Sequence, residues 1–166
     1  IPFWPQLPKR SFRENMYVQF SERLPGLVLD EKNKTIHIDT SKASQQIEGL
    51  YAEYLDNNLE YFKISRDYAE GFYEFLEFLE RSTKLIKFVK GQITGPISFA
   101  LSLTDQNKKP IIYDKDLLEV LTKVLCMKVK WQIRELKKVF PQVMIFIDEP
   151  YLVSIGSSYV TINIQD

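Results

Sequence analysis

The residues best suited to chemistry are two adjacent acids, Asp148 and Glu149, which follow the apolar run 143–147 (VMIFI) and precede Pro150. A continuous apolar run is typical of a strand buried on both faces, as in a parallel sheet. In (β/α) folds, active-site groups lie at the carboxyl ends of such strands. A carboxylate there is partly desolvated yet accessible, which suits cation binding or proton transfer. The alternative interpretation is that Asp148 caps the next turn and Glu149 is solvated.

Metal and nucleotide chemistry have little support. His37, the single histidine, alternates with apolar neighbours on a predicted hairpin strand, which favours a surface residue over a ligand. Cys126, the single cysteine, lies inside a predicted helix, where a small buried hydrophobic residue is expected. Zinc sites need several such ligands, so we expect none made by this chain alone. The glycines lack the spacing of a phosphate-binding loop.

The composition limits the class of protein. The 166 residues are 45% hydrophobic and 27% charged, as in globular chains. The 22 basic and 22 acidic residues balance, so no nucleic-acid partner is expected. No apolar run approaches the ~18 residues that cross a bilayer, so no membrane partner is expected. A single cysteine cannot form an internal disulfide, which favours the cytoplasm. The chain starts without Met and ends on the apolar segment 161–166, so we expect a fragment of a longer protein.

The elements that must position the two acids alternate along the chain. Strands are predicted at 1–6, 27–29, 35–39, 85–93 and 143–148, and the second and third of these form a hairpin. Helices are predicted after a capping box at Ser11 and Glu14, over 41–57, after a cap at Ser65, and over 114–139, where Lys128 is among the core-facing residues. Pro96 suits the first position of another helix. The pattern indicates one α/β unit over residues 1–166, with a parallel sheet.

Three segments together, in matching order and spacing, resemble the catalytic barrel of cobalamin-independent methionine synthase. Residues 13–16 (RENM), followed by Phe20 and 25–28 (PGLV), resemble that family's Arg-Asn-Asp-Met helix and the Gly and apolar strand after it. Residues 89–98 (VKGQITGPIS) are similar to its Val-Lys-Gly-(x-x)-Thr-Gly-Pro-(Val)-Thr strand end, and 147–150 (IDEP) match its Asp-Glu-Pro strand end. Residues 1–8 (IPFWPQLP) resemble a short-form subgroup that lacks the N-terminal duplicate barrel.

The resemblance implies a (β/α)8 TIM barrel, in the superfamily of uroporphyrinogen decarboxylase. This chain is then a partial TIM barrel, roughly strands two to four with their helices and a β-hairpin insertion. The resemblance also implies that Asp148 holds the amino group of homocysteine, with Glu149 supporting the strand end. It implies zinc in the intact protein, which activates the thiol as thiolate and whose His, Cys and Glu ligands belong to later strands outside this chain.

Two positions depart from the family pattern. Ser102 stands where the family has a Trp that stacks on the folate pterin, and serine offers no stacking face. The acid that the family places shortly before Arg-Asn-Asp-Met falls near Arg10, although Gln6 can approach the same space. The sequence therefore supports the transfer of a methyl group to a thiol, but it gives less support to methylfolate as the donor of that group. A methyl-corrinoid protein, carrying methylcobalamin, is the substitute donor that short relatives suggest.

The sequence is therefore interpreted as part of a zinc-dependent S-methyltransferase that acts on a small thiol. The candidate substrate-binding residues are Asp148, Glu149 and Gln6. One alternative is another member of the superfamily, which methylates a different thiol or decarboxylates a tetrapyrrole. Another is a structural fragment without activity. A partial barrel has unpaired strand edges, so we expect it to associate with a second copy or with its missing half.

Overall fold

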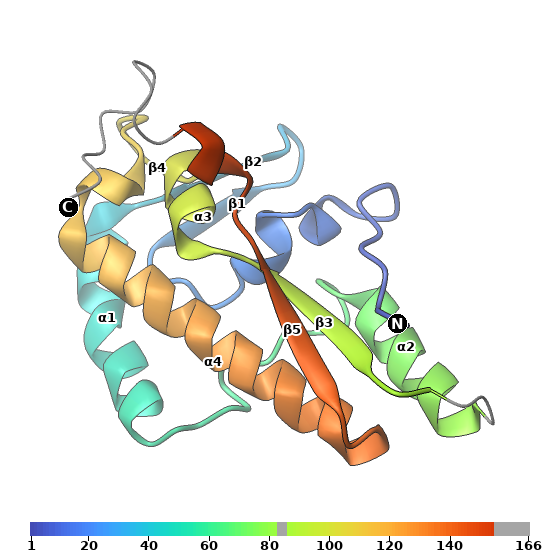
Figure 1. Ribbon diagram of the computed structural model, residues 1–166. Coiled ribbons are helices and arrows are strands. Elements are labelled where there is room, and N and C mark those ends of the chain that lie inside the picture. Colours follow the sequence, from blue (N-terminus) through green and yellow to red (C-terminus); the bar gives the residue numbers. More distant parts are fainter. Residues whose placement is uncertain (83–85, 155–166) are drawn as a thin grey trace.

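The computed structural model describes residues 1–82 and 86–154, and in these residues helices and strands alternate (Figure 1). The helices are α1 (Thr40–Leu55), α2 (Glu70–Arg81), α3 (Pro96–Ser102) and α4 (Lys115–Val139). The strands are β1 (Leu27–Asp30), β2 (Thr35–Ile38), β3 (Val89–Thr94), β4 (Thr104–Asp105) and β5 (Val143–Asp148). Short 3-10 turns lie at Phe12–Glu14, Val18–Phe20, Ile111–Tyr113 and Pro150–Ser154. The described residues form a mixed α/β fold without a closed barrel.

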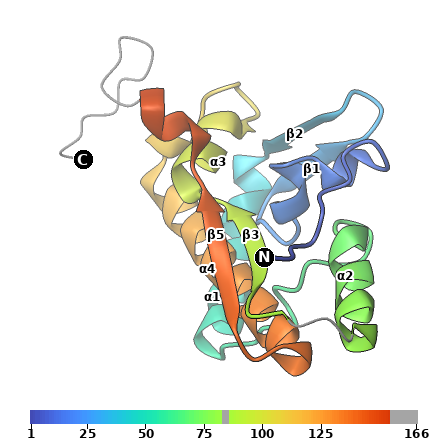
Figure 2. The same cartoon turned by 45° about the vertical axis from the view of Figure 1, so that its right-hand side comes forward.

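Strands β3 and β5 form a parallel pair that runs from Val89 opposite Val143 to Thr94 opposite Asp148 (Figure 2). The connection between them contains α3 and α4, so the predicted alternation of parallel strands and helices is confirmed here. On the other side of β3, Phe3 forms a parallel bridge with Lys90. The N-terminal segment therefore runs alongside β3 in the same direction.

The predicted hairpin is confirmed in the second sheet. Strands β1 and β2 pair antiparallel, and β2 also pairs in parallel with the short strand β4. Asp39, directly after β2, caps α1 by accepting hydrogen bonds from the Ser41 and Lys42 backbone N–H groups. The hydrogen bonds from Ser41 and Lys42 favour the carboxylate form and lower the pKa of Asp39 to about 2.

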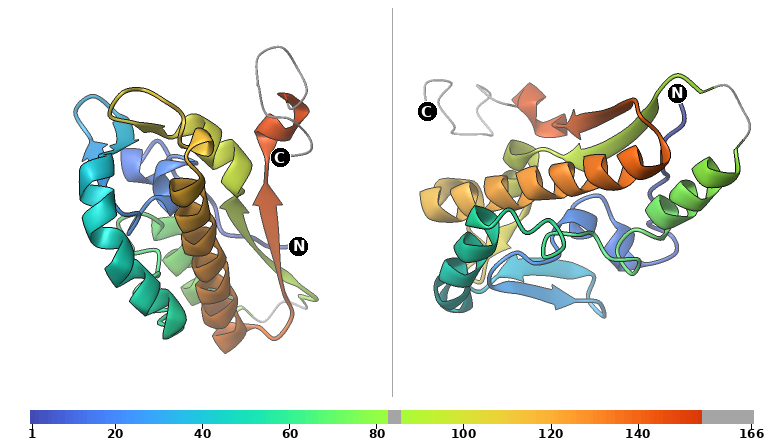
Figure 3. Two further views of the ribbon diagram at one scale, coloured as in Figure 1. Left: turned by 90° about the vertical axis from the view of Figure 1, so that its left-hand side faces the viewer. Right: turned by 90° about the horizontal axis from the view of Figure 1, so that it is seen from below.

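Helix α4 lies between the two sheets. The β3–β5 pair packs against one side of it, and α1 and the β1–β2 hairpin lie on the other (Figure 3). Its apolar positions repeat at helical spacing and are buried, which confirms the helix predicted over 114–139. Trp131 packs against Phe72 of α2 with ring centroids 4.9 Å apart, and Phe72 meets Trp4 at 5.7 Å. This aromatic cluster joins the N-terminal segment, α2 and α4.

A closed ring of three buried hydrogen bonds fixes the N-terminal segment beside β3. The Trp4 indole donates to Gln132 Oε1 at 3.2 Å, and Gln132 Nε2 donates to the Gln92 carbonyl at 3.0 Å. The Gln92 side chain then donates to the Trp4 carbonyl at 3.0 Å. Every polar group in the ring is therefore satisfied away from water, as a buried polar group requires.

The N-terminal predictions are partly wrong. The strand expected over 1–6 is reduced to the single bridge at Phe3. The helix expected after Ser11 is replaced by two 3-10 turns, because Asn15 takes an extended conformation (ψ 148°) that ends the first turn. The capping box does not form: the Ser11 hydroxyl accepts from the Arg13 N–H, and the Glu14 side chain pairs with Arg10 instead.

Three further predictions need correction. Ser65 does not cap α2, which begins at Glu70; its carbonyl accepts hydrogen bonds in the turn before the helix. Strand β3 begins at Val89, not at 85, and residues 83–85 and 161–166 lie outside the described residues. Cys126 is exposed, not buried, because Thr122 and Lys130, four residues to either side, place it on the solvent-facing stripe of α4.

Strand β5 is not buried on both faces as its sequence suggested. Phe146 is 48% exposed and Ile147 is 62% exposed. Within the described residues, β5 pairs only with β3, so its outer edge has no neighbouring strand. The apolar character of the run predicted the strand correctly, but burial depends on neighbours that a local pattern does not specify.

Candidate functional site

The two acids predicted from the sequence lie at the carboxyl end of β5, next to the end of β3. Thr94 and Asp148 are register partners, and the Asp148 carbonyl accepts a hydrogen bond from the Gly95 N–H at 2.9 Å. Side chains alternate between the two faces of a strand. A Cβ on Gly91 would lie 2.5 Å from Ile145 and 2.9 Å from Gln132 of α4, so odd-numbered positions here face α4. Asp148 therefore belongs to the opposite face, which is open at β5, where Phe146 and Asp148 are exposed, and closed at β3, where Gln92 and Thr94 are buried.

Glu149 is occupied by structural bonds. Its two carboxylate oxygens accept from the backbone N–H groups of Ile97 at 3.0 Å and Ser98 at 2.7 Å, at the start of α3. A carboxylate satisfies the free N–H groups of a helix start and complements its dipole. Gly95 makes room for this contact, since a Cβ there would lie 2.2 Å from Glu149 Cδ. The acid that caps a turn is therefore Glu149, and the alternative assignment of that role to Asp148 is wrong.

The Asp148 side chain, by contrast, is exposed and has no hydrogen-bond or ion-pair partner among the described residues. On the same open face, the Lys90 ammonium lies 4.3 Å from the Phe146 ring centroid and 5.1 Å from that of Phe3. Cation–π contacts of this kind hold the ammonium over the sheet. Asp148 is thus an uncommitted carboxylate on a rigid strand end, available to a cationic group of a ligand.

Gln6 is held by a buried partner. Its Nε2 donates to Gln19 Oε1 at 2.8 Å, and Gln19, which is fully buried, donates to the Tyr68 carbonyl at 2.7 Å. Because the N-terminal segment runs parallel to β3 from Phe3 onward, Gln6 follows it toward the strand ends where Asp148 lies. No hydrogen bond joins Gln6 to either acid in the part of the chain that the structure describes. The structure brings Asp148 and Glu149 together and leaves Gln6 separate.

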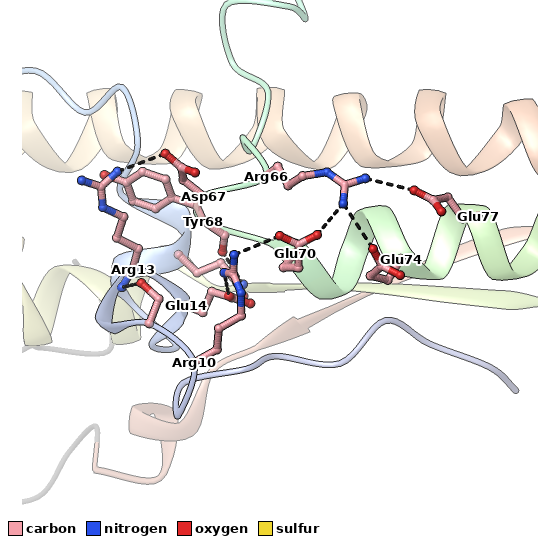
Figure 4. A network of polar contacts seen from close by, with 11 residues as sticks. Arg10, Arg13, Glu14, Arg66, Asp67, Tyr68, Glu70, Glu74 and Glu77 are labelled. Carbon is pink, nitrogen blue, oxygen red and sulfur yellow. Dashed lines mark hydrogen bonds and ion pairs between the residues drawn. The ribbon is translucent and has the colours of Figure 1, made fainter.

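Sequence reasoning missed the buried acid Glu14. Arg10 pairs with Glu14 and also reaches Glu70 of α2 at 2.9 Å (Figure 4). Glu14 is completely buried, and its second oxygen, Oε2, has no hydrogen-bond partner among the described residues. The resemblance places an acid near position 10. The structure has Arg10 there, and its guanidinium pairs with the buried carboxylate of Glu14. The i,i+4 spacing of Arg10 and Glu14 was the available signal, and the capping-box interpretation concealed it.

A second feature near the strand ends is a pocket of about 300 Å³ with Tyr17, Asn15 and Ser102 in its wall. The Tyr17 ring packs against Phe99 of α3 at a centroid distance of 5.8 Å. Burial raises the pKa of the Tyr17 hydroxyl, so it stays protonated at neutral pH.

The zinc implied by the resemblance has no ligand set here. In residues 1–82 and 86–154 there is no group of three His, Cys, Asp or Glu side chains that could hold a metal ion. His37 lies half-buried on β2, and Cys126 lies exposed on α4. No chemical step can therefore be assigned to a metal in this part of the protein. None of the helices described combines the length and the apolar character needed to cross a bilayer.

Comparison of the chain with protein-family models, with curated proteins and with solved structures gave no match.

The unequal roles of the two acids predict unequal effects on stability. We expect Glu149→Gln to lower the free energy of unfolding by about 1–2 kcal/mol, because the amide nitrogen cannot accept from a backbone N–H. Asp148→Asn should change it by less than about 0.5 kcal/mol, as for other exposed substitutions without partners. Urea unfolding of both variants measures the difference. Equal losses would contradict the assignment of the cap to Glu149 alone.

Proposed function

We propose that this chain provides the amino-acid anchor of an S-methyltransferase of the methionine synthase type, with homocysteine as the thiol. The observation that supports this most directly is the division of the strand-end acids. Glu149 is bound to the start of α3, whereas Asp148 is exposed at the end of β5 and has no partner among the residues that the structure describes. In this proposal the chain forms part of a TIM barrel whose open face becomes the interior, where the carboxyl ends of strands surround a substrate.

Asp148 would bind the ammonium group of the amino-acid thiol. A carboxylate and an ammonium form a charge-assisted hydrogen bond that is stronger than a neutral one. Glu149 would support substrate binding indirectly, by fixing the end of β5 against α3 through Ile97 and Ser98. Gln6 would contribute its free carboxamide oxygen, since its nitrogen already donates to Gln19.

The methyl donor that fits best is a methyl-corrinoid protein. Ser102 offers no ring on which a pterin could stack. The zinc that lowers the pKa of the thiol would be held by residues outside this chain. We also propose a cytoplasmic location, because Cys126 is a free exposed thiol.

The activity can be tested with the full-length protein and two donors. We expect methyl transfer to homocysteine from methylcobalamin or a methyl-corrinoid protein, and much slower transfer from methyltetrahydrofolate. Production of methionine from methyltetrahydrofolate alone would overturn the choice of donor. No methionine from either donor, with a folded and zinc-loaded protein, would overturn the proposed activity.

The free edge of β5 also implies association. Within the described residues the outer edge of β5 has no neighbouring strand, and an edge with exposed Phe146 and Ile147 is a template for a strand of another chain, or for the remaining strands of a barrel. We expect the 166-residue chain to form dimers or larger assemblies at micromolar concentration. Light scattering measures the mass, and Ile147→Lys, which adds a charge at the edge, should shift it toward the monomer. A parent chain that is fully monomeric under these conditions would contradict the expectation.

A further inference from the structure

A large pocket in the described residues lies away from Asp148 and the strand ends. It has a volume of about 770 Å³, within the range of small-molecule sites. Five segments surround it: the 3-10 turn with Arg13, the turn 22–25, the start of β1, one face of α1 and the loop 61–68. Leu24 and Leu50 form an apolar floor, and both are almost completely buried. Tyr61 and Tyr68 stand in its wall.

Arg23, which lines this pocket, has an unfavourable backbone conformation. Its φ of 71° lies in the left-handed region, which side chains with a Cβ rarely adopt. Such outliers persist where the surrounding structure enforces them, and they concentrate at ligand sites. Lys34, Asn57 and Lys108 share this conformation, but none of these three lines the pocket. Substitutions at these three positions can therefore show the effect of the backbone strain separately from any effect on the pocket.

The guanidinium of Arg23 lines the pocket and has no carboxylate partner among the described residues. It lies 5.4 Å from the centroid of the Tyr61 ring and forms no ion pair with the residues described. The other guanidinium, of Arg13, pairs with Glu31 at 2.6 Å. It also pairs with Asp67 at 3.5 Å and lies over the Tyr68 ring (Figure 4). The stacked guanidinium of Arg23 therefore presents its N–H donors to the pocket without an anion to receive them.

The acids of the pocket are already engaged. Glu22 Oε2 accepts from the Ser65 N–H at 2.8 Å, and Glu53 Oε2 accepts from the Asn58 side chain at 2.6 Å. Neither of them pairs with Arg23. A ligand anion would therefore complete the charge balance of this guanidinium without displacing an existing bond.

Gly49 is the second residue here that weakens the fold without a structural reason. It lies inside α1, where glycine is less favourable than alanine by roughly 0.5–1 kcal/mol. A Cβ on Gly49 would meet no atom within 4 Å, whereas a Cβ on Gly26, Gly71, Gly91 or Gly95 would meet an atom at 2.5 Å or less. Packing thus explains the other four glycines of the described residues but not Gly49. Because Gly49 has no side chain, it leaves space free in the pocket that it lines.

We propose that this pocket binds a small organic anion, whose carboxylate or phosphate group pairs with Arg23 and whose body fills the space over Gly49 beside Tyr61. The planar guanidinium fork suits two-point contact with either oxyanion, and the tyrosine ring and Leu50 suit an apolar or aromatic body. Arg23 and Gly49 both lower the stability of the fold, and both line this pocket. Residues that bind a ligand commonly reduce stability in this way. The site is separate from Asp148 and does not depend on the methyltransferase proposal.

The test is a titration of the isotope-labelled 166-residue chain, followed by amide chemical shifts. The probes are phenyl phosphate, phenylacetate and inorganic phosphate. We expect saturable shifts at Arg23, Gly49 and Tyr61 with at least one of the two aromatic anions, and weaker binding of inorganic phosphate. The tighter aromatic probe identifies the preferred oxyanion. Absence of saturable shifts in this pocket with all three probes would overturn the proposal.

Two variants and two matched controls separate binding from folding. Arg23→Gly should raise the melting temperature, because it removes backbone strain, and should weaken binding at least about tenfold by removing the cation. Lys108→Gly relieves the same strain (φ 65°) and should raise the melting temperature without changing affinity. Gly49→Leu should block the pocket, whereas Ser44→Leu, on α1 but outside the lining, should not. Unchanged affinity in Arg23→Gly or Gly49→Leu would overturn the proposal.

Discussion

Replacing Lys128 with methionine is expected to raise the free energy of unfolding by about 2 kcal/mol at pH 7. The Lys128 side chain is completely buried in α4, and its ammonium makes one long hydrogen bond, 3.4 Å, to the Phe62 carbonyl. Burial disfavours the charged form and lowers the pKa of Lys128 to about 8, although Glu22 nearby acts in the opposite direction. Methionine has a similar length without the charge, and its main cost is the lost bond to Phe62, about 1 kcal/mol.

The same burial makes the stability of the parent protein depend on pH. Below pH 8 the lysine is protonated in both states, so its burial penalty is fully present. Between the folded pKa of about 8 and the ordinary value of 10.5, the unfolded chain binds more protons than the folded one, and stability rises with pH. We expect a gain of about 2 kcal/mol between pH 7 and 9.5. Above that range Tyr73, whose pKa burial raises to about 12, acts in the opposite direction.

Urea unfolding at several pH values tests both statements. The parent chain should become more stable from pH 7 to 9.5, and Lys128→Met should be more stable at pH 7 and lack most of this rise. Lys130→Met is the matched control, because Lys130 is exposed on the same helix and should keep the rise. A parent profile that is flat over this range would show that the Lys128 ammonium has a compensating partner.

The sequence was most informative where structure is local. The periodic apolar positions of α4 and the alternation in the β1–β2 hairpin depend on neighbours within a few residues, and both elements form as expected. Even the burial of Lys128 followed from helical spacing alone. The N-terminal region was mispredicted because it is held by distant contacts. Trp4 bonds to Gln132, which is 128 residues away, and Arg10 reaches Glu70.

At the candidate site, too, the sequence predicted the local structure but not the contacts between distant residues. The apolar run and the two acids predicted a strand end with carboxylates, and the structure has that strand end at Asp148. Which acid is free could not be read from the sequence, because Glu149 is fixed by backbone N–H groups 51 and 52 residues away and by the space over Gly95. The exposure of Phe146 was equally hidden, since it depends on which strands lie beside β5.

The decisive test of the proposed function is Asp148→Asn in the full-length protein. Asparagine keeps the shape and removes the charge, so it should leave the fold intact and weaken only the binding of an ammonium group. Loss of a charge-assisted partner costs about 2–4 kcal/mol. The Michaelis constant for homocysteine should therefore rise by roughly ten- to a thousand-fold, at about 1.4 kcal/mol per decade.

The control for the effect of Asp148→Asn on homocysteine is a thiol that lacks the amino group. With 4-mercaptobutanoate, which differs from homocysteine only by the missing amine, the parent and Asp148→Asn should have nearly equal Michaelis constants. Glu149→Gln, in contrast, should affect both thiols alike, because its carboxylate holds α3 and does not touch the substrate. Equal losses for both thiols in Asp148→Asn would mean that Asp148 supports the strand end. No loss for either thiol would mean that the amino group is bound elsewhere, and the assignment of Asp148 as the anchor would then be wrong.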